Sequence, residues 1–159
     1  MAERTRLGRR AGRVFAIAAL AAVALAVLFA QPATASSGGG TTTELFRVPT
    51  SVHLVGSEVV VSGFASDLFT GTLDGVGSLT FSAVIEPSGV ARVLVDGTCT
   101  CTVEGRTGSV RLTLVLRDTT SIGGSLKGLL FARGISDDLT GFRGIFRVHD
   151  HGYSGFYSL

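Results

Sequence analysis

The chain has 159 residues, of which 45% are hydrophobic and 16% charged, and its formal net charge is +2. Five of the 14 basic residues and one of the 12 acidic residues precede Ser36, so the remainder carries nine against eleven, a net charge of −2. Without a basic surface to neutralise phosphates, we expect no nucleic-acid partner.

Residues 1–35 are predicted to be a secretory signal peptide. Five arginines precede an apolar run at 14–30, and Ala33-Thr34-Ala35 then forms an A-x-A site with cleavage expected before Ser36. We therefore expect a secreted, extracellular protein with no stable membrane insertion after cleavage. The apolar run of 17 residues is close to the roughly 20 that span a bilayer. Retention as a signal anchor in the membrane is the alternative.

Residues 36–43 (SSGGGTTT) are polar and of low complexity, which predicts a flexible tether. Residues 44–159 are predicted to form a single domain, because short apolar runs alternate with period two and are broken by Gly, Asp, Ser and Pro. In SLTFSAVIE and SVRLTLVLRD one face is apolar and the other largely polar, as in half-buried antiparallel strands. We expect strands at about 44–49, 57–65, 68–73, 77–86, 89–103, 108–118, 122–134, 139–148 and 153–158.

Glycine is unusually frequent within these predicted strands. Of the 22 glycines, 20 follow residue 35, and interior glycines favour bends and bulges in a strongly coiled sheet. The predicted fold is therefore all-β: a small antiparallel barrel of about eight strands, closed or nearly closed. Such a barrel leaves no exposed edge and fills its lumen from alternating positions.

The glycine-containing segments FTGTLDGVG, CTVEGRTGS, DLTGFRG and YSGFYSL, read in order, resemble the allene-oxide-cyclase-like barrel family, in particular an uncharacterised bacterial branch. The resemblance covers about residues 58–159. It implies a calycin-like barrel, related in shape to lipocalins and dirigent proteins, that is often a homo-oligomer and in some members holds an apolar molecule. The polar groups of the plant cyclases cannot be placed here residue by residue. The positions that carry the resemblance are Thr70, Gly71, Gly75, Gly105, Arg106, Gly108, Ser109, Leu139, Gly141 and Gly144.

A ligand cavity is predicted from the inward positions of the barrel. The aromatic side chains of the predicted domain either fill the lumen as core or line a cavity. In a cavity, Arg111, Arg143, Arg147 or the tyrosine hydroxyls would orient the ligand. The candidate lining residues are Phe81, Leu112, Leu114, Tyr153 and Tyr157.

Cys99 and Cys101 lie two residues apart in one predicted strand. Their Cα atoms would be roughly 6.6 Å apart on one face, at the outer edge of disulfide reach. An oxidising compartment disfavours free thiols. A disulfide between the two is the first interpretation, and bonding to another chain or two thiols sheltered in the lumen are the alternatives.

His149 and His151, on either side of Asp150, are weak candidates for a metal site. Zinc would need further ligands, whereas Asp150-His151-Gly152 suits a turn between two strands. We therefore expect a turn and no metal.

Other catalytic signals are absent from the sequence. Glu58, Asp67, Asp74 and Glu86 are the carboxylates available for acid–base work, and nothing in the sequence selects among them. No nucleophile elbow, P-loop or dinucleotide fingerprint occurs, so no cofactor is predicted and enzymatic activity stays open.

Three functions fit such a secreted barrel. The first is the holding of a small apolar molecule in the lumen without catalysis. The second is an isomerase or cyclase resembling the plant enzymes, and the third is a structural or partner-binding exoprotein. A converging acid and hydroxyl in a wet lumen would favour the enzyme, and a lumen packed solid would favour the structural role.

Overall fold

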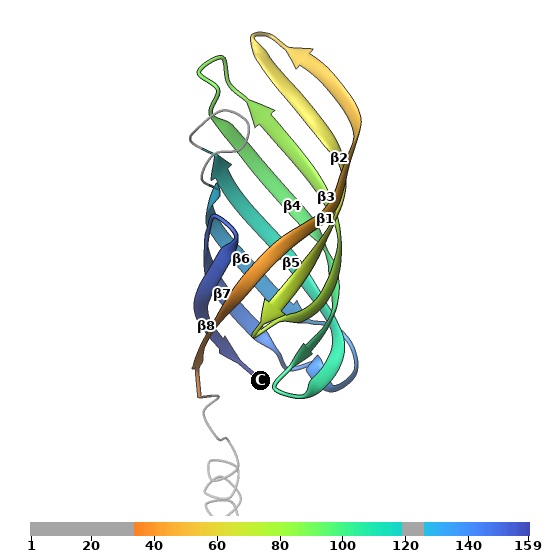
Figure 1. The fold of residues 1–159 in the computed structure, drawn as a ribbon, viewed down its shortest axis with the longest axis vertical. Coiled ribbons are helices and arrows are strands. Elements are labelled where there is room, and N and C mark those ends of the chain that lie inside the picture. Colours follow the sequence, from red (N-terminus) through yellow and green to blue (C-terminus); the bar gives the residue numbers. More distant parts are fainter. Residues whose placement is uncertain (1–33, 119–125) are drawn as a thin grey trace, which may run out of the picture. The chain divides into compact units, whose positions relative to one another are not determined.

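A computed structural model describes residues 34–118 and 126–159, which form one ring of eight antiparallel strands (Figure 1). Each strand pairs with the next along the chain, and β1 pairs with β8. The predicted all-β, nearly closed barrel is thereby confirmed. Residues 34–159 form one compact unit that contains every strand pairing. The strands are β1 Ser36–Val55, β2 Glu58–Gly71, β3 Asp74–Ile85, β4 Ala91–Val103, β5 Arg106–Asp118, β6 Leu126–Gly134, β7 Arg143–His149 and β8 Gly152–Ser158.

Residues 36–43 belong to β1, so the prediction of a flexible tether is wrong. Ser36 to Thr41 pair with Tyr157 to Gly152 of β8 and close the ring. The glycines in this segment allow neighbouring strands to approach closely. A Cβ added at Gly40 would collide with the carbonyl oxygen of Thr70 and would lie 2.6 Å from the hydroxyl of Tyr153.

The ring is closed over only part of the length of β1. Thr42 donates its backbone N–H to the carbonyl of His151, 2.7 Å away. Beyond that contact, β1 pairs only with β2 among the described strands. Figure 1 shows this upper part of β1 continuing with β2 away from β8. The hydrogen-bonded wall of the barrel is therefore open on this side, above the β7–β8 turn.

Two predicted strand boundaries differ from the structure. The predicted strands 57–65 and 68–73 are one strand, β2, because Ser66 and Asp67 continue its pairing with both neighbours. The start of the predicted strand 139–148 is the single-turn 3-10 helix η1 (Asp137–Leu139), and β7 begins at Arg143. Residues 122–125 of another predicted strand lie outside the described residues. In the described part of the chain, no helix is long and apolar enough to cross a membrane.

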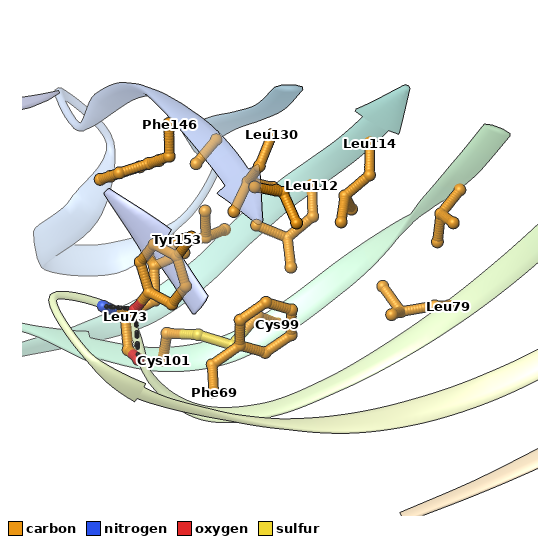
Figure 2. Close-up of a cluster of buried hydrophobic side chains, with 14 of the residues drawn as sticks. Phe69, Leu73, Leu79, Cys99, Cys101, Leu112, Leu114, Leu130, Phe146 and Tyr153 are labelled. Carbon is orange, nitrogen blue, oxygen red and sulfur yellow. Dashed lines mark hydrogen bonds between the residues drawn. A yellow bond between two sulfur atoms is a disulfide. The ribbon is translucent and has the colours of Figure 1, made fainter. Parts of the chain in front are cut away.

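The lower half of the barrel is packed solid with inward side chains. As the alternation predicted, Val110, Leu112, Leu114 and Leu116 of β5 are all buried. Figure 2 shows side chains from several strands meeting in this cluster. The ring of Phe69 fits there because β3 has glycine at position 77, where a Cβ would lie 2.8 Å from that ring. The largest fully buried side chains of this cluster are Phe69, Phe142, Phe146, Leu73, Leu112, Leu130 and Leu139.

Candidate functional site

The upper half of the lumen contains a cavity of about 80 Å³. Its wall is mainly apolar because the inward positions of β3 to β7 carry Leu, Val and Phe. Its polar side chains come from the other elements, namely β1, β2, β8 and the β7–β8 turn. The apolar lining includes Leu79, Phe81, Val95, Leu114, Leu116 and Leu130, and the polar lining consists of Thr42, Arg47, Asp67, Asp150 and Tyr153.

Asp67 of β2 brings a carboxylate to this apolar cavity. Its Oδ1 atom is buried and has no hydrogen-bond partner in the described part of the chain. Burial raises the pKa of Asp67 above its usual value of 3.8, and the nearby Glu44 raises it further while Arg47 lowers it. A buried acceptor without a partner is unfavourable, so this oxygen is still able to accept a hydrogen bond.

Arg47 and Glu44 lie on β1, next to Asp67, and form an ion pair of 2.5 Å between Nη2 and Oε2. The guanidinium carbon of Arg47 lies 5.4 Å from the ring centroid of Phe81, in cation–π contact. Arg47 is thus held over the aromatic lining. Arg47 is already paired with Glu44, so its guanidinium is not free to form an ion pair with Asp67.

Tyr153 also reaches the cavity, but its hydroxyl is engaged in the structure of the barrel. The hydroxyl accepts the N–H of Leu73 at 2.9 Å and faces the carbonyl oxygens of Thr70 at 3.0 Å and Leu73 at 3.2 Å. Figure 2 shows the hydroxyl directed at the β2–β3 turn. A tyrosine hydroxyl has one proton to donate, so Tyr153 has none to spare for chemistry beside Asp67.

The predicted lining residues divide between the two halves of the lumen. Phe81, Leu114 and Tyr153 line the cavity. Leu112 lies in the packed half, fully buried. Tyr157 also lies there, with its ring 5.9 Å from that of Phe142 and its hydroxyl donated to Glu104. Alternation shows which side chains point inward, but it does not show at which height of the barrel they pack.

The arginines considered as cavity groups lie elsewhere. Arg111, Arg143 and Arg147 are exposed on the outer face of the barrel. Their side chains alternate with the buried ones of β5 and β7, so they cannot orient a molecule in the lumen.

Cys99 and Cys101 form a disulfide within β4. Their Cα atoms are 5.4 Å apart, closer than the roughly 6.6 Å of a fully extended strand, and this contraction brings the pair within reach. Both residues are buried against the packed half of the core, as Figure 2 shows. The structure therefore contains the disulfide between Cys99 and Cys101 that was the first interpretation of the sequence.

His149 and His151 lie at the β7–β8 turn, as expected. Asp150 and His151 form the turn, with Asp150 at a φ of 54°, and Nδ1 of His149 lies 2.8 Å from Oδ2 of Asp150. Both histidines are exposed. No group of three or more His, Cys, Asp or Glu side chains within residues 34–118 and 126–159 could hold a metal ion.

Asp67 was one of four carboxylates that the sequence offered as candidates, and nothing in the sequence distinguished it from the other three. One signal pointed to it: Ala65, Asp67 and Phe69 alternate with period two, so an unbroken strand places all three inward. The predicted bounds 57–65 and 68–73 instead left Ser66 and Asp67 between two strands.

Comparisons with protein-family models, curated proteins and solved structures gave no match for this chain. The resemblance to allene-oxide-cyclase-like barrels therefore remains a prediction.

Proposed function

We propose that the lumen cavity holds a small, mostly apolar molecule that donates a hydrogen bond to Asp67, without transforming it. The observation that carries this proposal is the buried, unpartnered Oδ1 of Asp67 in a mainly apolar cavity. Small-molecule sites combine an apolar wall with few polar groups that fix orientation. An amine or an alcohol offers the donor that Asp67 lacks.

The volume limits the size of the ligand. Each water-sized group needs about 10–15 Å³, so 80 Å³ accommodates several such groups. Drug-sized pockets begin at about 300 Å³. The expected ligand is therefore a short or narrow molecule, or one whose remainder extends through the side opening beside β1.

The polar groups support holding rather than catalysis. An isomerase or cyclase needs an acid and a base that converge on the ligand. Asp67 supplies one ionisable group without a partner. Of the other ionisable lining residues, Asp150 is paired with His149 and Arg47 with Glu44, and the hydroxyl of Tyr153 is bound to backbone atoms of Thr70 and Leu73. Export by residues 1–35 completes the proposal of a secreted carrier, and nearly all of that segment lies outside the described residues.

A matched series of ligands tests this function on residues 34–159. Thermal melting with hexylamine, hexanol and hexanoate should show the largest stabilisation with the amine, less with the alcohol and none with the carboxylate, because like charges repel. Asp67→Asn should remove the advantage of the amine, and Asp138→Asn, at an exposed position, should not.

Native mass spectrometry of the chain released by its producer identifies the natural cargo. Extra mass that disappears on denaturation is the expected result. A bare mass, together with no thermal shift from any of the three ligands, would overturn the proposal in favour of a structural role.

A further inference from the structure

One outer wall of the barrel carries side chains in parallel rows, which the register of β4 to β8 defines. Residues directly opposite in neighbouring strands lie side by side on the same face. The two outer rows are cationic and consist of Arg111, Arg133 and Arg143 in one row and Arg92, Arg117 and Lys127 in the other. The two inner rows are largely apolar. One contains Phe131, Ile145 and Phe156, with Asp96 and Thr113 at its β4–β5 end, and the other contains Leu94, Val115 and Leu129, with Arg147 of β7 beside Leu129. We call these four rows the cationic wall.

The apolar rows of the cationic wall are accessible. Their side chains are exposed by between 40% for Phe131 and 66% for Phe156. Rows two residues apart along a strand are separated by roughly 6.7 Å, so the two cationic rows lie about 20 Å apart with the apolar rows between them. A depression of about 720 Å³ lies in the upper part, where Leu94, Val115 and Leu129 meet Arg117 and Lys127.

Most cations of this wall form no ion pair with a described residue. Arg111 pairs with Asp96 at 3.0 Å, and Arg92 pairs with Glu58 and Glu86. The other four cations of the outer rows, Arg117, Lys127, Arg133 and Arg143, form no ion pair with any described residue.

Like charges even face one another across the strands. Arg133 lies directly between Arg111 and Arg143, and Arg117 lies opposite Lys127. Such pairs destabilise a sheet, so anions supplied from outside the barrel would stabilise this wall.

A second copy of the chain does not provide those anions. Two copies joined by the same wall would place cations against cations. The carboxylates of Glu44, Glu58, Glu86 and Asp96 already pair with arginines of their own chain. The partner of the wall is therefore expected to be an anionic surface other than this wall.

We propose that the cationic wall docks on the surface of an anionic lipid bilayer. Arginine and lysine side chains can bury their stems along apolar residues and place their charges at phosphate headgroups. The apolar rows between them would contact the boundary of the acyl chains, as the apolar face of an interfacial helix does. A bilayer offers phosphates to the cationic rows and acyl chains to the apolar rows without any specific sequence. An acidic protein would instead need apolar side chains placed opposite each apolar row, so the wall fits a bilayer better.

The test is co-sedimentation of residues 34–159 with vesicles of phosphatidylcholine alone and of phosphatidylcholine mixed equally with phosphatidylglycerol. Binding should occur to the anionic vesicles, should be weak on the neutral ones and should fall as salt is added. Each cation near an anionic surface changes partitioning by about fivefold, so Arg143→Gln should weaken binding by about that factor. Arg106→Gln, at the start of β5 and outside the four rows, is the matched control and should change binding much less.

The apolar rows have a matched control as well. Ile145→Ser should weaken binding to anionic vesicles, whereas Val76→Ser, at an exposed position on β3, should not. Melting temperatures of all four variants verify that the barrel is intact. Equal binding to neutral vesicles, equal effects of the two arginine variants, or self-association that depends on Arg143 would overturn the proposal. Failure to bind either vesicle would also overturn it, and would leave an acidic protein as the partner of the wall.

Discussion

The hydroxyl of Tyr153, near the start of β8, accepts the backbone N–H of Leu73 at the β2–β3 turn, 2.9 Å away across the barrel. The ring of Tyr153 packs edge-on against Phe146 at 5.3 Å. Tyr153→Phe keeps the ring but leaves the buried N–H of Leu73 without its acceptor. We expect a loss of about 1–3 kcal/mol in the free energy of unfolding, measured by urea denaturation.

Tyr157→Phe is the control for this substitution. The hydroxyl of Tyr157 donates a hydrogen bond to Glu104. The carboxylate of Glu104 is exposed, so water can hydrate it once the hydroxyl is removed. The expected loss is below about 1 kcal/mol. If both variants lose the same free energy, the bond to Leu73 has no special role in joining β8 to the turn.

The carboxyl of Asp67 should make stability depend on pH. Its pKa is raised in the folded barrel, so the folded state binds the proton more tightly than the unfolded chain. The stability from this group is fully present below the ordinary pKa of 3.8 and is lost as the pH rises through the raised value. Asp67→Asn stays neutral throughout, so it should be more stable than the parent at neutral pH.

The difference between the two proteins should vanish below pH 3.8, where Asp67 is protonated. Melting curves at both pH values measure this, and Asp138→Asn controls for an exposed carboxylate. A variant that is less stable than the parent at neutral pH would show that Asp67 has a stabilising partner. The gain in stability together with lost amine binding would identify Asp67 as a binding group rather than a structural one.

Gly40 is the point at which β1 closes the ring. It lies opposite Gly71 of β2 and Tyr153 of β8, and an added Cβ would collide with the backbone of Thr70. Gly40→Ala should therefore cost about 3 kcal/mol or more, because a backbone carbonyl cannot move aside as a flexible side chain can. Gly141→Ala, where an added Cβ meets nothing within 4 Å, should change stability by less than about 0.5 kcal/mol. Urea denaturation of the two variants compares them, and a tolerant Gly40 would restore the tether interpretation.

The Cys99–Cys101 disulfide should contribute little to the folded state. It closes a loop of only three residues, and the entropy that so short a loop removes from the unfolded chain is worth about 1–2 kcal/mol. Reduction with dithiothreitol should lower the melting temperature slightly and leave the barrel folded by circular dichroism. Complete unfolding on reduction would show that the bond holds β4 in the ring.

Local alternation predicted the faces of the strands but not their reach. The inward residues of β5 follow from period two, because neighbouring side chains point to opposite faces. That residues 36–43 close the ring depends on pairing with β8, and composition reports only that the segment is polar and rich in glycine. Asp67 was not predicted as a site residue, because a polar residue that points into the lumen resembles a strand end when the neighbouring strands are unknown. The height at which Leu112 and Tyr157 pack depends on strand tilt, which no single strand reveals.

The pairing of β1 with β8 sets the order in which the barrel can form. Ser36 and Tyr157 are about 120 residues apart in the chain, the longest separation of any strand pair in the ring. Contacts of such long range are slow to form, because the entropy of closing a large loop is lost before the contact contributes any stabilising energy. Hairpins from β2 to β8 can assemble beforehand as a curved, open sheet. Closure by the first strand is then expected to be the final event, so the lumen would acquire its complete wall only after the other seven strands have paired.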